Sequence, residues 1–194
     1  MFSVLLFIGS MWLRLFYRVK VFGAENIPAH GSAVLCANHV CYKDLIVLGS
    51  SIKRKARWLA KAELFKNPII GWILTKLGGF PVKRGGNDKG AVKTVYDLLS
   101  KGEIVGIFPE GTRVKDKANR PKEKRGFVSF AVKAKVPIIP VSLVYGKGPF
   151  KRAMLFSNIK VVIHEPFFPN FEKKYSNVEL MAVAVEIMNI IYSE

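Results

Sequence analysis

Cysteine and histidine are both scarce in this chain of 194 residues, which holds two cysteines and three histidines. Two cysteines are too few for a disulfide-stabilised scaffold. Cys36 falls on an expected strand and Cys41 in the loop after it, so we interpret both as reduced thiols of a cytosolic protein. Neither a C-x-x-C pair nor a histidine cluster accompanies them in the sequence. The sequence therefore predicts no metal site.

Acidic residues are also few: 14 Asp and Glu face 31 Lys and Arg, for a formal net charge of +17 at pH 7. Half of the residues are hydrophobic, which excludes an intrinsically disordered chain. The length suits a single domain with a sizeable core. Because the chain is apolar and basic at once, we expect an anionic and apolar partner, such as a membrane surface.

A strongly basic chain can also bind nucleic acid, and composition alone leaves this alternative open. The sequence contains no helix-turn-helix, zinc-finger or RNP-like pattern. Its basic clusters also lack the interleaved aromatic residues on which bases stack. We therefore expect no nucleic-acid partner.

An apolar run opens the chain, but it is shorter than the roughly 20 residues that a membrane-spanning helix needs. A secretory signal carries its positive charges before the apolar run, whereas here Arg14, Arg18 and Lys20 come at its end or after it. We therefore expect residues 1–20 to form a membrane-associating helix that lies in the lipid interface, ahead of one domain over residues 21–194. A helix packed on the domain's own core and a short true span are the alternatives.

Short apolar runs alternate with longer stretches of helical character through the rest of the chain. The runs predict strands at 32–37, 57–60, 79–82, 104–109, 138–144 and 160–164, and the longer stretches predict helices at 43–53, 68–77, 89–101, 126–135 and 178–192. This alternation predicts a single α/β domain with a largely parallel sheet flanked by helices, preceded by the apolar N-terminal helix. Ligands of such sheets bind at the carboxyl ends of the strands, so the loops that leave those ends are candidate sites.

The last of these helices has a recognisable start and an apolar stripe. Ser176 or Asn177 is expected to cap it, with Glu179 in the first turn. Spacings of three and four residues predict one face that packs on the core. That face comprises Val178, Met181, Val185, Met188 and Ile191.

The loop after the strand at 32–37 contains His39 and Asp44, five residues apart. Five residues turn about 140° around an ideal helix, so the side chains meet only if His39 lies in the loop and Asp44 in the first turns of the helix. There the carboxylate can hold one imidazole N–H while the other nitrogen takes a proton, as in the base and orienting acid of a catalytic triad. A surface pair with no role is the alternative. The other histidines, His30 and His164, are interpreted as structural.

A second candidate loop follows the strand at 104–109 and reads Phe-Pro-Glu-Gly-Thr-Arg over residues 108–113. Gly111 lets the backbone approach a ligand or adopt a positive φ, and Arg113 offers a planar fork that suits a phosphate. An ordinary turn with solvated charges is the alternative. Together, the His-x-x-x-x-Asp and Phe-Pro-Glu-Gly-Thr-Arg motifs, about 70 residues apart, resemble the glycerolipid acyltransferase family and, within it, the lysophosphatidic acid acyltransferases.

Two further blocks extend this resemblance over roughly residues 22–165. Residues 78–84 (Gly-Gly-Phe-Pro-Val-Lys-Arg) resemble the family's second block, whose arginine helps to hold the acceptor phosphate and would here be Arg84. Residues 136–141 resemble the fourth block, an apolar strand that shapes the site. The sequence departs from the family at Cys41, where a serine is usual.

The resemblance implies acyl transfer from acyl-CoA or acyl-carrier protein to the sn-2 hydroxyl of lysophosphatidic acid, which forms phosphatidic acid without a further cofactor. His39 would be the general base and Asp44 its orienting partner. The resemblance also implies that Arg84, Glu110, Gly111, Thr112 and Arg113 bind substrate. Arg113 would bind the phosphate, and Glu110 would bond the acceptor's glycerol hydroxyl or hold the loop.

The sequence contains no G-x-S-x-G motif, so direct attack of the acceptor hydroxyl is the simpler route. Covalent catalysis by Cys41 is an alternative. The same fold could instead acylate another acceptor, such as glycerol-3-phosphate or a lyso-aminolipid. We expect the enzyme on the cytoplasmic face of the cell membrane, as a peripheral or monotopic protein.

Two basic clusters fit an acidic substrate on an acidic surface. One consists of residues 53–55 with Arg57 and Lys61 and contains no carboxylate in the sequence; the other spans residues 113–125. As groups they would attract anionic lipid or an acidic acyl donor. For any single lysine of the second cluster, a solvated loop is the simpler interpretation.

Overall fold

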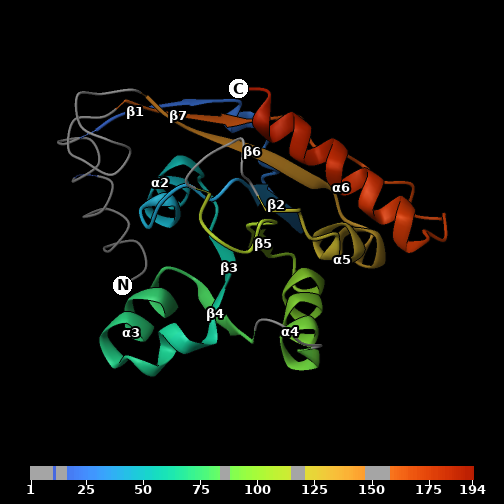
Figure 1. Ribbon diagram of the computed structural model, residues 1–194, viewed down its shortest axis with the longest axis horizontal. Helices are drawn as coiled ribbons and strands as arrows, with labels where there is room; N and C mark the ends of the chain where they lie inside the picture. Colours follow the sequence, from blue (N-terminus) through green and yellow to red (C-terminus); the bar gives the residue numbers. More distant parts are fainter. Residues whose placement is uncertain (1–10, 12–16, 84–87, 115–120, 147–157) are drawn as a thin grey trace.

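The computed structural model describes residue 11 and residues 17–83, 88–114, 121–146 and 158–194. In this part of the chain, seven strands form one sheet in the order β1-β7-β6-β2-β5-β3-β4 (Figure 1). The strands are β1 (Arg18–Phe22), β2 (Ala33–Ala37), β3 (Ala56–Lys61), β4 (Gly79–Val82), β5 (Ile104–Ile107), β6 (Ile138–Tyr145) and β7 (Asn158–Ile163). Neighbouring strands are parallel except for the antiparallel pair β6 and β7.

Helices cover both faces of the sheet. They are α2 (Asp44–Ser51), α3 (Pro68–Lys76), α4 (Lys89–Ser100), α5 (Gly126–Ala134) and α6 (Asn177–Tyr192), with short 3-10 turns η1 (Ala24–Asn26) and η2 (Ala62–Lys66). Figure 1 shows α2 on one side of β2 and α4, α5 and α6 on the other. The predicted α/β fold with a largely parallel sheet is confirmed.

The central strand β2 shows why the sheet needs two helical layers. Every residue of β2 is buried, as expected for a strand with helices on both faces. Leu35 packs in a core with Val47 and Leu48 of α2. Its neighbour Cys36 points the other way, into a core with α4, α5 and α6. The carboxyl end of β2 therefore emerges between two packed helical layers.

Strand β1 was not predicted from the sequence. It pairs in parallel with β7, with Arg18 opposite Asn158 and Phe22 opposite Val162. The expected N-terminal helix over residues 1–20 lies largely outside the described residues, but residues 18–20 belong to the sheet. Across the described part of the chain, no helix is both long and apolar enough to cross a bilayer.

The predicted core face of the last helix is wrong in part. Ser176 does cap α6, in a capping box with Glu179. However, Val178 is 78% exposed and Val185 is also exposed. The buried residues of the helix are Leu180, Ala184, Ile187, Met188 and Ile191. Since α6 is apolar on most sides, two stripes satisfy the same spacing, and packing on the sheet selects the second.

The first basic cluster is divided in the structure. Arg54 points back into the fold, where its guanidinium donates to the backbone carbonyls of Pro28, Gly31 and Gly102. Two other members have acidic neighbours: Arg57 Nε lies 3.8 Å from Glu103, and Lys61 Nζ lies 3.6 Å from Glu63. The cluster contains no carboxylate in the sequence, but the fold places two carboxylates beside it.

Candidate active site

His39 and Asp44 meet at the carboxyl end of β2. β2 ends at Ala37 and α2 begins at Asp44, so the histidine lies in the connecting loop and the aspartate in the first helical turn. Their side chains are joined by a 2.7 Å contact between Nδ1 of His39 and Oδ2 of Asp44. A carboxylate accepts hydrogen bonds, so Nδ1 of His39 donates to Asp44. His39 also lines the pocket described below.

Asp44 is fully buried and accepts several hydrogen bonds. The backbone N–H groups of Val40 and Cys41 donate to Oδ2 at 2.7 and 2.9 Å. The hydroxyl of Tyr145, at the end of β6, donates to Oδ1 at 2.6 Å. Burial, followed by the charge of Asp44, raises the pKa of Tyr145 well above its usual range, so the phenol keeps its proton and donates. These donors compensate the buried charge and hold the carboxylate in one orientation.

Cys41 occupies the position where the family usually has serine. Its thiol lies 3.3 Å from Oδ1 of Asp44 and 3.3 Å from the hydroxyl of Tyr145. Burial, followed by the nearby charge of Asp44, raises the pKa of the Cys41 thiol. A nucleophilic cysteine needs the opposite environment, one that favours the thiolate. The geometry therefore favours a supporting role for Cys41 at the carboxylate over covalent catalysis.

The second candidate loop packs directly against the first. The ring of Phe108 stacks on the His39 ring at 4.2 Å between centroids, and the Trp58 ring lies against Phe108 at 5.1 Å. The backbone N–H of Val114 donates to the carbonyl of His39 at 2.7 Å. Gly111 adopts φ 66°, a left-handed conformation that glycine reaches at little cost, and this turn returns the chain toward His39. The loops are thus held together by side-chain stacking and by a backbone hydrogen bond.

Glu110 belongs to the second loop, and its side chain is only 3% exposed. Its Oε2 accepts the backbone N–H of His39 at 3.2 Å, and its Oε1 accepts the hydroxyl of Tyr192 at 2.6 Å. Burial raises the pKa of Glu110, although both hydrogen bonds oppose that shift. Because Tyr192 is the last residue of α6, Glu110 links the C-terminal helix to the backbone that carries the histidine. Two roles are expected for Glu110: bonding the acceptor's glycerol hydroxyl or holding the loop. These contacts correspond to the second role.

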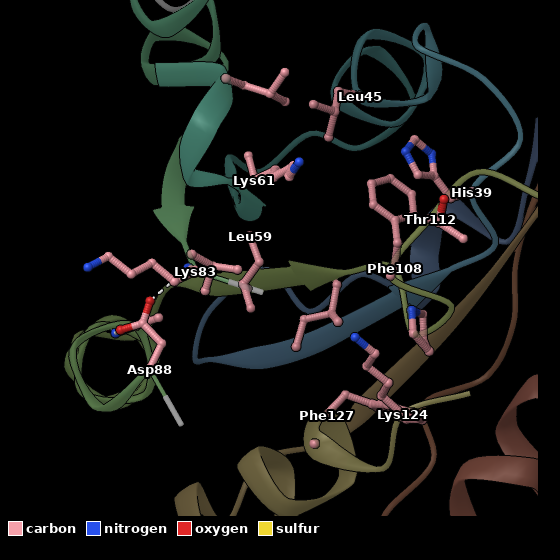
Figure 2. Close-up of a pocket in the computed structure, with 18 of the residues that line it drawn as sticks. His39, Leu45, Leu59, Lys61, Lys83, Asp88, Phe108, Thr112, Lys124 and Phe127 are labelled. Atoms are coloured by element: carbon pink, nitrogen blue, oxygen red, sulfur yellow. Dashed lines mark hydrogen bonds between the residues drawn. The ribbon is translucent and has the colours of Figure 1, made fainter. Parts of the chain in front are cut away.

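A pocket of about 520 Å³ opens beside these loops. Figure 2 shows His39 and Phe108 at one end of it and Lys83 and Asp88 at the other. Its wall is largely apolar and includes Leu59, Leu74, Val82, Ile107, Phe127 and Phe130. Four cationic side chains also line it, and we call them the cationic rim: Lys61, Lys83, Arg113 and Lys124. Asp88 is the one carboxylate among the described lining residues.

Arg113 is the member of the cationic rim that the sequence singled out. Its guanidinium lies over the ring of exposed Tyr42, 3.6 Å from the centroid, in a cation–π contact. Arg113 is itself exposed, and it lines the pocket together with Gly111 and Thr112. Arg84 lies outside the described residues. The other two histidines lie away from this pocket: His30 is exposed in a turn, and Nε2 of His164 contacts Ser142 at 2.7 Å.

Tyr145 and Tyr192 are site residues that sequence reasoning missed. They lie 101 residues from Asp44 and 82 residues from Glu110, respectively. No local motif marks them, because each reaches the site only through the order of the strands and the packing of α6. Within the described ranges, no three His, Cys, Asp or Glu side chains converge as metal ligands.

The fold and the site define an α/β protein in which a histidine, hydrogen-bonded to a buried aspartate, lies at one end of an apolar pocket with a cationic rim. A family model described as Acyltransferase matches residues 18–144, and the chain belongs to this family. The predicted resemblance is confirmed, and the protein is an acyltransferase.

Individual proteins agree with this assignment. The 1-acyl-sn-glycerol-3-phosphate acyltransferase of Bacillus subtilis (strain 168) is 36% identical over 174 residues, which cover 88% of this chain and 84% of that protein. The chloroplastic 1-acyl-sn-glycerol-3-phosphate acyltransferase LPAT1 of Arabidopsis thaliana is 32% identical over 172 residues, which cover 82% of this chain and 48% of that protein. This chain therefore spans about half the length of the plastid relative.

A solved structure extends the agreement to three dimensions. The crystal structure of the 1-acyl-sn-glycerophosphate (LPA) acyltransferase PlsC from Thermotoga maritima matches this chain with a TM-score of 0.72 and 26% sequence identity. The match covers 99% of this chain and 79% of that one. The sheet and its helical layers are therefore shared by the two proteins.

Proposed function

We propose that this acyltransferase moves an acyl group from a thioester to the sn-2 hydroxyl of 1-acyl-sn-glycerol-3-phosphate, forming phosphatidic acid for phospholipid biosynthesis. The donor is acyl-CoA or acyl-carrier protein, and no cofactor besides it takes part. The observation that carries the proposal is the His39–Asp44 pair at one end of an apolar pocket with a cationic rim. Similarity to proteins named as 1-acyl-sn-glycerol-3-phosphate acyltransferases supports the choice of acceptor.

His39 acts as the general base in the proposed reaction. The acceptor hydroxyl gives its proton to Nε2 of His39 while its oxygen attacks the thioester carbonyl. The buried carboxylate of Asp44 stabilises the imidazolium that forms. Collapse of the tetrahedral intermediate completes the ester and breaks the C–S bond, and His39 returns the proton to the departing thiolate. The step balances without an acyl-enzyme, in keeping with the raised pKa of the Cys41 thiol.

The cationic rim binds the acceptor in this proposal. Arg113, with Arg84 as a second arginine from the sequence motif, pairs with the phosphate, since each guanidinium can form two parallel hydrogen bonds. The turn at Gly111 and Thr112 lies at the pocket beside it and contacts the substrate. Glu110 acts through the loop that it holds, because its carboxylate is buried beneath His39.

The proposed substrates are lipids, so we also propose an anionic membrane surface as a partner. The enzyme would work on the cytoplasmic face of the cell membrane as a peripheral or monotopic protein. The net charge of +17 favours such a surface, because basic residues near an anionic leaflet each contribute about 1 kcal/mol.

One assay tests the proposed acceptor and donor together. The protein purified in detergent is offered lysophosphatidic acid, glycerol-3-phosphate or a lyso-aminolipid, each with acyl-CoA and with acyl-carrier protein. Mass spectrometry identifies the product and the position of the new chain. We expect the fastest transfer to the sn-2 hydroxyl of lysophosphatidic acid. Faster acylation of either other acceptor would replace the proposed substrate, and no transfer to any of them would overturn the proposal.

A further inference from the structure

The segment between β3 and β4 exposes an unusual number of large apolar side chains. Five of them are 40–70% exposed: Leu64, Ile69, Ile70, Trp72 and Ile73. We call this set the α3 face. Among the nine residues of α3, Gly71 alone is buried. Contiguous apolar surface of this kind on a soluble domain marks a place where something binds.

The local structure holds the α3 face outward. The side chain of Asn67 caps α3, with Oδ1 accepting from the backbone N–H groups of Ile69 and Ile70 at 3.0 and 3.1 Å. Gly71 turns its bare side to η2, where an added Cβ would lie 3.1 Å from the carbonyl oxygen of Phe65. Figure 1 shows α3 beside β4, at the edge of the sheet, away from α5 and α6. The helix is therefore anchored through its glycine side and leaves its apolar side chains to the surroundings.

Charge next to the α3 face selects the kind of partner. Lys66 is exposed at the end of η2, Lys76 closes α3, and Lys61 precedes η2. Glu63 is the acidic residue of this segment and pairs with Lys61. A second copy of this chain would bring the same lysines and another charge of +17 against them. An anionic lipid leaflet offers both an apolar interior for the face and negative headgroups for the lysines.

The α3 face is also continuous with the pocket. Leu64 belongs to the face and lines the pocket, and Leu74 of α3 lines the pocket as well. Trp72, whose ring combines a large apolar surface with one N–H donor, suits the boundary between acyl chains and headgroups. A chain that leaves the leaflet at this face reaches the apolar wall of the pocket without crossing water.

We propose that the α3 face docks on an anionic leaflet and delivers lipid substrates to the pocket. The proposal rests on the proposed function for the identity of those substrates. Docking itself depends only on the apolar side chains and the lysines beside them. The face lies between β3 and β4, so it is separate in the chain from the N-terminal segment expected to associate with membranes.

The test compares two double variants of the full chain. Ile69→Glu with Trp72→Glu places two charges on the α3 face, and Phe168→Glu with Val178→Glu places the same charges at exposed apolar positions elsewhere. Co-sedimentation with vesicles of equal parts phosphatidylcholine and phosphatidylglycerol measures binding. We expect the first variant to lose at least about tenfold in vesicle affinity, the equivalent of one large apolar side chain no longer buried. The control variant should bind like the wild type.

Activity is measured on lysophosphatidic acid held in vesicles and on a short-chain form dissolved as monomers. The α3 variant should lose turnover on vesicles in proportion to binding and keep its turnover on monomers. Retained turnover on monomers also shows that the variant is folded. If the wild type acylates neither form, the proposed function fails, while the vesicle affinities still test docking.

Fluorescence provides a readout that needs no catalysis. Brominated lipid in the vesicles should quench the tryptophan fluorescence of the wild type. The fraction of this fluorescence that is quenched should fall sharply in Trp72→Phe. Equal vesicle affinity for both double variants, or unchanged quenching in Trp72→Phe, would overturn the proposal. A third outcome would also overturn it: the wild type is a dimer, the α3 variant is a monomer, and both bind vesicles equally well. The α3 face would then bind a second copy of the chain and not a membrane.

Discussion

His39 and the cationic rim line the same pocket, yet the His39–Asp44 pair and the rim are built in opposite ways. Asp44 is completely buried and accepts hydrogen bonds from His39, two backbone N–H groups and Tyr145. Arg113, in contrast, is exposed, with its guanidinium over the exposed ring of Tyr42. Proton transfer requires heavy atoms held to within fractions of an ångström, whereas attraction of a charged headgroup falls off slowly with distance. The difference matches these two tasks.

The pair and the cationic rim also differ in the contacts that support them. Glu110 holds the backbone of His39 from below and is held in turn by Tyr192 of α6. The pair is thus held by a chain of hydrogen bonds that reaches α6. The cationic rim draws its members from four separate segments, and an exposed cation can adjust its rotamer at small cost. Substitutions should therefore affect catalytic rate at the pair and substrate affinity at the rim.

The largest effect is expected at His39. Replacing His39 with alanine removes the proposed base, and positioned bases typically contribute 10²–10⁴-fold in rate. We expect kcat to fall by roughly that factor, with Asp44→Asn costing somewhat less because the imidazole remains. Steady-state kinetics on lysophosphatidic acid in detergent measures both. Near-normal turnover by a folded His39→Ala protein would remove His39 from the mechanism.

Arg113 should show the next largest effect, and in a different kinetic constant. Hydrogen bonds to charged groups contribute about 1.5–3 kcal/mol, so Arg113→Ala should raise KM for the acceptor roughly 10- to 150-fold. Arg113→Lys keeps the charge but loses the planar fork and should fall in between. Arg84→Lys is expected to resemble Arg113→Lys.

The matched control for the rim is Lys101→Ala, which removes an exposed cation at the end of α4. It should leave both KM values unchanged. If Arg113→Lys instead raised KM for the acyl donor and not for the acceptor, Arg113 would belong to the donor site. The contrast between the rim and the pair would then hold, but the rim would have a different ligand.

The same contrast explains how much of the site could be predicted from sequence. His39 and Asp44 are five residues apart, so the geometry of one loop and one helix start is enough to bring them together. The Phe108 loop could be recognised from its local motif. Tyr145 and Tyr192 could not, because only the finished sheet and the docked α6 bring their hydroxyls to Asp44 and Glu110.

Fold prediction failed where local pattern was ambiguous. The alternation of apolar runs located six strands, but β1 reads Arg-Val-Lys-Val-Phe and borders an apolar segment that was interpreted as a single helix. In α6, Val178 and Leu180 both begin a stripe with the right spacing. Only the contact with the sheet decides which stripe is buried, and that contact is not encoded in spacing.

A smaller effect is expected at Tyr145, which supports the pair without touching substrate. Tyr145→Phe removes the hydroxyl that donates to Asp44 and leaves the buried carboxylate with one hydrogen bond fewer. A single hydrogen bond contributes about 0.5–1.5 kcal/mol, so kcat should fall roughly 2- to 12-fold. KM for both substrates should stay unchanged, because the hydroxyl contacts Asp44 and Tyr145 is not among the described residues that line the pocket.

The split between kcat and KM separates this role from a purely structural one. A packing defect that displaced the two loops would raise KM as well as lower kcat. Tyr175→Phe is the control, since it removes a tyrosine hydroxyl that accepts from the backbone of Asn170 away from the pocket. Its kcat and KM should match those of the wild type.

The smallest effect is expected at Glu110, in the pH dependence of the melting temperature Tm. Burial raises the pKa of Glu110 in the folded protein, so between its ordinary value and the raised one the folded state holds a proton that the unfolded chain has lost. Stability from this group is therefore fully present at low pH and declines as pH rises through that window. Glu110→Gln is neutral at every pH and can still accept the N–H of His39 through its amide oxygen. We expect thermal melts of this variant, followed from pH 4 to pH 8, to lack the wild-type decline in Tm that is due to Glu110. An unchanged decline of Tm in the variant would show that Glu110 titrates alike in the folded and unfolded chains. Glu110 would then be less isolated from water than its contacts indicate.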